Sequence, residues 1–70
     1  MDILEFEGIK NPEEYTELTL SWNELTEIPD LESFKNLETL DLSFNDIKEI
    51  DGLENLTKLK ELDLRNNFYI

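Results

Sequence analysis

The chain has 70 residues, which is enough for one small domain that buries a smaller fraction of its surface than larger domains do. It contains no cysteine and no histidine, which excludes disulfide bonds and thiolate metal sites and removes the commonest general base. Its formal net charge of -12, from 18 acidic and 6 basic residues, disfavours nucleic acids and anionic membranes and favours a basic protein partner, unless the charge mainly provides solubility.

The first fourteen residues carry an apolar residue or proline at every third position: Ile3, Phe6, Ile9 and Pro12. Asn11 stands three positions before Glu14, and Pro12 occupies the position favoured for the first residue of a helix. We therefore expect a short helical turn near residues 11–14. With Leu4, this segment has enough apolar residues to cover the start of a fold.

The opening "MDILEFEGIK" lacks the basic and apolar regions of a signal peptide. No apolar run approaches the roughly 18 residues that a membrane span requires. An intracellular, cytoplasmic location is the default expectation.

Residues 15–23 read "YTELTLSWN", in which Leu18 and Leu20 alternate with polar residues. This alternation predicts a short β-strand with one buried face. The same pattern returns in "LETLDLSFN" (37–45) and "LKELDLRNN" (59–67). Stacked copies of such a strand would form a parallel sheet.

These strands belong to a 22-residue repeat that runs without a gap through 15–36 and 37–58 and into the shorter segment 59–70. Apolar residues share columns: Tyr15, Leu37 and Leu59; Leu18, Leu40 and Leu62; Leu20, Leu42 and Leu64; Leu25, Ile47 and Tyr69. Asparagine fills one column in every copy: Asn23, Asn45 and Asn67. The period predicts that each copy stacks on the next and buries the shared apolar columns.

The asparagine follows each predicted strand, where the chain must turn and its buried backbone groups need partners. An amide side chain has two donors and an acceptor and can bridge its own turn to the neighbouring one, so these asparagines are predicted to be structural rungs. Beyond Asn45, apolar residues recur at every third position, a spacing typical of extended or 3₁₀-like turns. Asp51 stands three positions before Glu54, so one short helical turn per repeat is expected.

The complete pattern, L-x-x-L-x-L-x-x-N-x-[LI]-x-x-I-x-x-L-x-x-L, resembles the leucine-rich repeat family, in its short 22-residue internalin-like subclass. The resemblance implies an α/β solenoid: a right-handed superhelix with a short parallel sheet on its concave face and 3₁₀ or short helical turns on its convex face. Residues 1–70 would then form a single domain. Its parts would be a half-repeat N-terminal cap (1–14), two repeats (15–36 and 37–58) and a truncated third repeat (59–70).

The resemblance also implies binding at the concave face, the surface that such solenoids usually use. We expect the partner-binding residues to be Glu17, Thr19, Trp22, Glu38, Asp41, Phe44, Glu61 and Asp63. Asp41 and Asp63 would lie about 4.8 Å apart on adjacent strands, where like charges destabilise a sheet unless a cation meets them. Water with the nearby Arg65, or a basic partner, could relieve the repulsion between the two carboxylates. Calcium would need a dedicated loop with more oxygen ligands.

Trp22 and Phe44 precede the asparagine in two copies, and Asn66 holds that position in the third. Two roles are open for the aromatic residues. They could cover the edge of the core, or they could anchor a protein partner as exposed aromatic side chains.

The last three residues, "FYI", depart from the polar residues that earlier copies have at the first and third of these positions. Either they fold over the last turn as a lid, or an open apolar face and sheet edge remain. In the second case we expect self-association or a place in a longer solenoid. The residues involved in self-association would be Leu62, Leu64, Phe68, Tyr69 and Ile70.

The sequence therefore favours a non-catalytic protein–protein interaction module that presents an acidic concave surface to a basic partner. The alternative is a structural role, as a capping or designed repeat fragment that self-associates through its C-terminal turn. Enzyme chemistry is disfavoured because no nucleophile is paired with a base and a flat sheet provides no pocket. Neither a cofactor nor a metal site is indicated, and the basic residues form no stripe that would bind nucleic acid.

Overall fold

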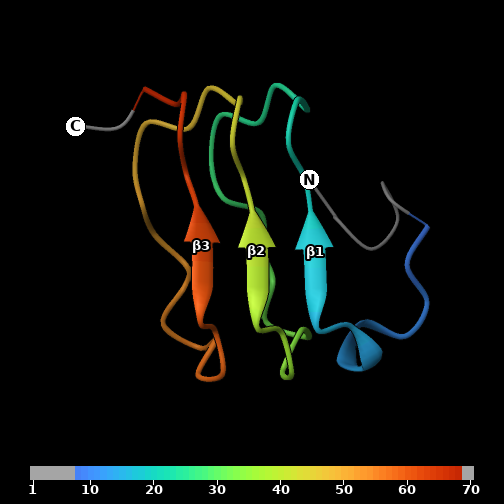
Figure 1. Ribbon diagram of the computed structural model, residues 1–70. Helices are drawn as coiled ribbons and strands as arrows, with labels where there is room; N and C mark the ends of the chain where they lie inside the picture. Colours follow the sequence, from blue (N-terminus) through green and yellow to red (C-terminus); the bar gives the residue numbers. More distant parts are fainter. Residues whose placement is uncertain (1–7, 69–70) are drawn as a thin grey trace.

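Three short parallel strands side by side form the centre of the molecule in the computed structural model, which describes residues 8–68 (Figure 1). The strands are β1 (Glu17–Thr19), β2 (Thr39–Asp41) and β3 (Glu61–Asp63), in the order β1-β2-β3. A 3₁₀ turn, η1 (Pro12–Glu14), precedes them. β1 and β2 each continue into a return segment that leads back to the start of the next strand, so successive turns stack (Figure 1).

The strands pair in the register of the 22-residue repeat. Leu18 lies opposite Leu40, and Leu40 lies opposite Leu62, so the predicted apolar column runs across all three strands. The backbone ladder extends past the ends of the strands: the Leu20 N–H donates to the Asp41 carbonyl over 2.8 Å. This in-register parallel sheet confirms the strand prediction and its periodicity.

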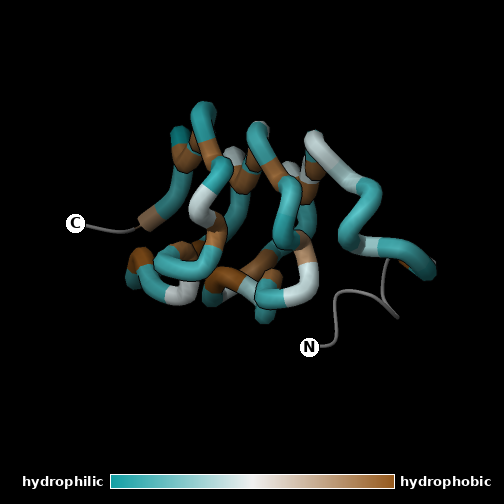
Figure 2. The backbone as a smooth tube through the Cα atoms, turned by 90° about the horizontal axis from the view of Figure 1, so that it is seen from below, coloured by the Kyte–Doolittle hydropathy of each residue, from teal (hydrophilic) through white to brown (hydrophobic). Residues whose placement is uncertain are grey.

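The core lies between the sheet and the return segments. Seven apolar side chains are fully buried there: Leu20, Leu31, Phe34, Leu37, Leu40, Leu42 and Ile47. Hydrophobic and hydrophilic segments alternate along each turn of the chain (Figure 2). Burying one such stripe per turn stabilises the stack by about 25 cal/mol for each Å² of apolar surface removed from water. No helix within residues 8–68 is long and apolar enough to cross a membrane.

Hydrogen bonds between residues three apart shape the return segments. The Phe34 N–H donates to the Leu31 carbonyl, and the Leu37 N–H donates to the Phe34 carbonyl. The next repeat has the same two bonds, between Leu56 and Leu53 and between Leu59 and Leu56. These i to i+3 bonds are the 3₁₀-type bonds that match the apolar spacing of three.

The two predicted helical turns have different outcomes. The first is present as η1, although the Asn11 side chain makes no capping hydrogen bond. The second is wrong, because residues 51–54 form a bend and a turn rather than a helix. Gly52 has a φ of +88°, which lies outside the right-handed helical region and interrupts the predicted turn.

The predicted asparagine rungs are present, and Asn45 shows the complete pattern. Its Nδ2 donates to the carbonyls of Leu20 and Leu42, at 3.0 Å in both cases. Its Oδ1 accepts from the backbone N–H groups of Asn23 and Leu25, also at 3.0 Å. The side chain therefore joins its own turn to the preceding one. The buried side-chain polar atoms of the described residues all have partners.

Asn67 repeats this arrangement one turn later. Its Oδ1 accepts from the Ile47 N–H at 2.9 Å, and its Nδ2 donates to the carbonyls of Leu42 and Leu64. Asn23 donates to the Leu20 carbonyl within its own turn. The ladder of amide side chains follows the stacking direction and links the three turns.

The two ends of the sheet differ in burial. Near the N-terminus Ile9 belongs to the core and Pro12 is buried, whereas Ile3, Leu4 and Phe6 lie outside the described residues. At the other end the Leu62 side chain is 40% exposed, while its column partner Leu40 is fully buried. Leu40 has a neighbouring strand on both sides, and β3 has one only on the β2 side within residues 8–68.

Candidate functional site

The face of the sheet opposite the core is polar, and we call it the outer sheet face. Because side chains alternate along a strand, the residues that flank each buried leucine point to this face. Glu17 and Thr19 flank Leu18, which is buried between two exposed neighbours. The residues that the sheet contributes to this face are Glu17, Thr19, Thr39, Asp41, Glu61 and Asp63. The predicted charged columns are thus brought together on one surface.

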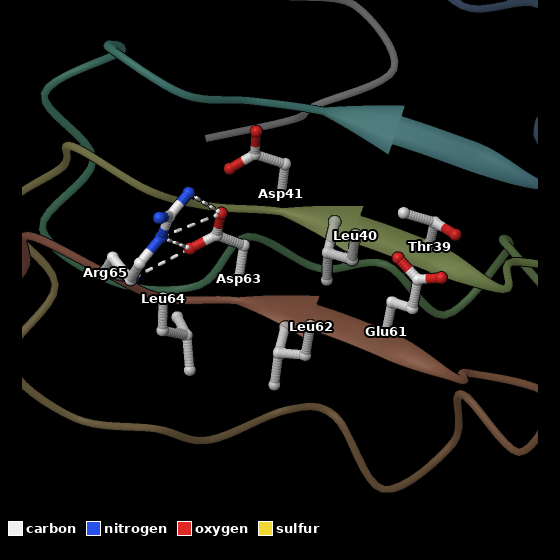
Figure 3. A pocket seen from close by; sticks show the side chains of 8 residues that line it. All are labelled: Thr39, Leu40, Asp41, Glu61, Leu62, Asp63, Leu64 and Arg65. Carbon is white, nitrogen blue, oxygen red and sulfur yellow. Dashed lines mark hydrogen bonds and ion pairs between the residues drawn. The ribbon is translucent and has the colours of Figure 1, made fainter.

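Asp41 and Asp63 are partners in the register between β2 and β3, as predicted. Asp41 turns its Oδ1 towards Ser43, which donates from its backbone N–H at 2.9 Å and from its Oγ at 2.6 Å. Asp63 instead accepts from the Arg65 side chain, with Nε 3.0 Å from Oδ1 and the terminal nitrogen 2.9 Å from Oδ2 (Figure 3). Each carboxylate therefore has its own local partner two residues later.

The pairing with Arg65 shifts the proton affinity of Asp63. Hydrogen bonds from the Arg65 side chain and from its backbone N–H lower the pKa of Asp63 below its usual 3.8, and the positive charge acts in the same direction. The side-chain hydrogen bonds to Asp63, together with its negative charge, raise the pKa of Arg65. A lowered carboxyl pKa keeps Asp63 ionised and is opposite to what a general acid at neutral pH requires.

A shallow depression lies between β2 and β3 on this side of the molecule (Figure 3). Its lining consists of Thr39, Leu40, Asp41, Glu61, Leu62, Asp63, Leu64 and Arg65. The described residues contain no cluster of acidic side chains placed to hold a metal ion. The depression is open and charged, so it suits contact with another macromolecule better than enclosure of a small substrate.

A second ion pair borders the same face. The Lys60 Nζ lies 3.7 Å from the Glu38 Oε1, with the Lys60 side chain largely exposed and that of Glu38 partly exposed. Exposed pairs of this kind typically contribute about 0–1 kcal/mol, so either partner can exchange for a group on another molecule. Glu38 therefore remains available for intermolecular contact.

Trp22 and Phe44, 22 residues apart in the sequence, stack on each other. Their ring centroids are 4.2 Å apart and the ring planes meet at 9°. Trp22 is 72% exposed and Phe44 is 37% exposed. Neither belongs to the core cluster or to the partly buried apolar residues packed against it. Trp22 therefore covers Phe44, and most of the Trp22 surface faces solvent.

The backbone at these aromatic residues is left-handed. The φ angles are +61° at Trp22 and +55° at Phe44, and Asn66 in the same column has +61°. The repeat pattern predicts neither this conformation nor the stacking. The signal available was Asn66, because asparagine is enriched among non-glycine residues with positive φ.

The predicted self-association residues are not equivalent in the structure. Leu64 is buried, whereas Leu62 is 40% and Phe68 65% exposed. The Phe68 N–H donates to the Ile47 carbonyl at 2.9 Å, which extends the contact between turns past Asn67. Tyr69 and Ile70 lie outside the described residues. Of the three residues that could form the lid, the structure describes Phe68 alone, and this side chain is largely exposed.

The comparisons with known proteins agree with the fold. A family model described as Leucine Rich repeats (2 copies) matches residues 14–47 and 35–70. Searches against curated proteins and against solved structures found no match. The two matched ranges together span most of the sequence and contain all three strands. The chain therefore belongs to the leucine-rich repeat family.

Proposed function

We propose that the protein is a non-catalytic interaction module whose outer sheet face, the concave face of the solenoid, binds a basic protein partner. Repeats of the leucine-rich family generally mediate protein–protein interaction and are generally non-enzymatic. The 22-residue period also supports assignment to the short internalin-like subclass, with a right-handed superhelix and short 3₁₀ or helical turns on its convex face.

The observation that carries the proposal is the in-register alignment of carboxylates across the strands. In one column across the strands, Thr39 lies between Glu17 and Glu61. Thr19, Asp41 and Asp63 form another column. The cations bordering this surface are Lys60 and Arg65, which are outnumbered by the carboxylates. Column neighbours of like charge repel each other, and a cationic partner would relieve this repulsion.

The field of the whole chain acts in the same direction. A net charge of -12 on 70 residues attracts basic partners over a distance of about one Debye length, roughly 8 Å at physiological ionic strength. Electrostatic steering of this kind mainly raises the association rate and excludes acidic partners. Contacts at the surface itself must then provide the remaining affinity and specificity.

The test is a charge reversal on the outer sheet face. The double variant Asp41→Lys/Asp63→Lys should lose binding to a basic partner captured by the wild type, and wild-type affinity should fall as salt is added. The control is Glu32→Lys/Glu54→Lys, which makes the same change in net charge at exposed positions outside the sheet. Equal loss in the two double variants would contradict a face-specific interaction, as would affinity that does not depend on salt.

A second candidate function is assembly through the exposed end of the sheet. It is supported by Leu62, which is 40% exposed although its column partners Leu18 and Leu40 are buried, and by the exposed Phe68. An edge strand presents backbone groups that another strand can pair with. Sedimentation over a range of concentrations tests it: self-association that Phe68→Glu abolishes would support it, and a monomer at high micromolar concentration would exclude it.

A further inference from the structure

At the column formed by Trp22, Phe44 and Asn66, the fold requires a left-handed backbone but does not require an aromatic side chain. All three residues have φ between +55° and +61°, so the turn demands a left-handed backbone at this position. Asparagine adopts this conformation readily, whereas for a bulky side chain it is a strained outlier. The third copy meets the demand of the turn with Asn66. The aromatic rings of the other two copies are therefore not needed to form the turn.

The two rings also do little for the core. Trp22 and Phe44 lie outside both the buried cluster and the apolar residues packed around it. They pack against each other, at a centroid distance of 4.2 Å and an interplanar angle of 9°. Strained backbone conformations that do not contribute to the core are most often found at functional sites. Here the strained backbone positions a flat aromatic surface that is open on the Trp22 side.

Backbone hydrogen bonds hold this surface at a defined place just past the carboxyl ends of the strands. The Trp22 N–H donates to the Ser43 carbonyl and the Phe44 N–H donates to the Arg65 carbonyl, so the sheet ladder continues up to the stack. Asp41 precedes Phe44 by three residues, and Thr19 precedes Trp22 by three. The stack therefore lies past the carboxyl ends of the strands, three residues along the chain from the column of Thr19, Asp41 and Asp63.

From this arrangement we infer that the Trp22–Phe44 stack binds the guanidinium group of an arginine in a basic segment of the partner. The inference rests on the proposed function and deepens it. A tryptophan face is the best aromatic surface for a cation, and the planar guanidinium group can stack on it while its N–H groups reach a carboxylate. Lysine has a compact, strongly hydrated charge and gains less from the same surface.

The outer sheet face already holds a pairing of this kind. The Arg65 guanidinium group donates to both oxygens of Asp63, from the Nε to Oδ1 at 3.0 Å and from the terminal nitrogen to Oδ2 at 2.9 Å. Asp41 has hydrogen-bond donors from Ser43 but no ion pair among residues 8–68. An incoming arginine that stacks on Trp22 would bring a positive charge to the region of this carboxylate.

The experiment uses end-blocked tetra-arginine and tetra-lysine peptides as probes. Trp22 is the only tryptophan in the sequence, so a change in tryptophan fluorescence on titration reports contact at the stack in the unmodified protein. We expect the arginine peptide to change this emission and to bind several-fold more tightly than the lysine peptide. Equal affinity for the two peptides, or unchanged emission at saturation, would overturn the inference.

Variants give a second, independent readout by calorimetric titration. Trp22→Asn and Phe44→Asn place in the first two copies the residue that the third copy already has at this position. Each should weaken binding of the arginine peptide about three- to thirtyfold while shifting the melting temperature by less than about 5 °C. Ile50→Asn is the control, because it removes an exposed apolar side chain outside the sheet.

The outcomes separate the inference from the proposed function. If the wild type binds neither peptide, then both are wrong. If it binds both peptides, and Trp22→Asn binds the arginine peptide as tightly as wild type does, then the charged face is supported and the aromatic site is overturned. Loss of binding in Ile50→Asn equal to that in Trp22→Asn would also overturn the aromatic site.

Discussion

The side-chain nitrogen of Asn45 donates to the carbonyl of Leu20, a residue 25 positions earlier, over 3.0 Å. This bond passes between two turns of the solenoid, and it forms in a buried environment where neither group can bond to water instead. The asparagine column is therefore a source of stability between turns as well as within each turn. Because the asparagines differ in burial, their alanine variants should differ in loss of stability.

We expect Asn45→Ala to destabilise the fold most among the asparagine variants, by about 3–5 kcal/mol, because several buried backbone groups lose their partners together. Asn67→Ala should cost less, about 1–3 kcal/mol, because its bonds are only partly buried. Chemical denaturation of each variant measures the difference. The exposed Asn36→Ala variant is the control, and an effect there as large as that of Asn45→Ala would contradict the ladder interpretation.

The leucine column makes a second ranking. Leu40→Ala should destabilise by about 2–5 kcal/mol, since its side chain is fully buried in the middle strand. Leu62→Ala, in the same column but 40% exposed, should cost about 1 kcal/mol. Thermal unfolding monitored by circular dichroism provides the comparison. Equal costs would mean that the end of the sheet is covered in solution, which would favour the assembly role.

Glu24 has a φ of +57° in an exposed position, and its side chain makes no hydrogen bond with other residues in the range 8–68. Its counterpart one repeat later, Asp46, is not among the positive-φ residues, so the repeat does not require this conformation. Glu24→Asn should stabilise the protein by about 0.5–1 kcal/mol because asparagine tolerates the left-handed region better. The matched control is Glu32→Asn, at an exposed site without positive φ, which should be close to neutral. A destabilised Glu24→Asn variant would show that the side chain has another role.

Acid should remove the contribution of the Asp63–Arg65 pair. Because the folded-state pKa of Asp63 is lowered below 3.8, the pair adds stability above that pH, and the addition is lost as pH falls through the folded-state value. The difference in unfolding free energy between wild type and Arg65→Gln should therefore be present at pH 7. It should vanish once the pH is below the folded-state pKa of Asp63. Using the difference cancels the change in overall charge repulsion, which affects both proteins. A difference that grows below pH 3.8 would contradict this assignment.

Most of the architecture could be predicted from the sequence because a repeat constrains its own neighbours. The 22-residue spacing of Leu18, Leu40 and Leu62 requires an in-register parallel stack, and the structure confirms it. The asparagine rungs were predictable from the hydrogen-bonding capacity of an amide beside a turn. The helical turn at residues 51–54 was predicted wrongly, since the capping pattern does not specify the backbone angle that Gly52 adopts.

The candidate site was predictable only in part. The columns correctly brought Asp41 beside Asp63, but the separate partners of these carboxylates, Ser43 and Arg65, depend on side-chain orientation. Trp22 and Phe44 share a column, which predicts that they are neighbours, but their stacking depends on the left-handed backbone at both residues. A one-dimensional pattern does not encode which ring face remains open to solvent.

The sequence by itself determined the period, the apolar columns and the amide ladder, because burial and hydrogen-bond satisfaction act identically in every repeat. Only the tertiary structure decided how equivalent positions diverge. Leu40 is buried on the middle strand, and Leu18 is buried on one edge strand in a core cluster that includes Ile9, whereas Leu62 is exposed on the other edge strand of the described sheet. Trp22 is more exposed than Phe44 because Phe44 is the middle residue of its column, whereas Trp22 has a column neighbour on one side only among the described residues. The burial of a side chain depends on its neighbours in three dimensions, and these differ between residues of the same type at equivalent positions of the repeat.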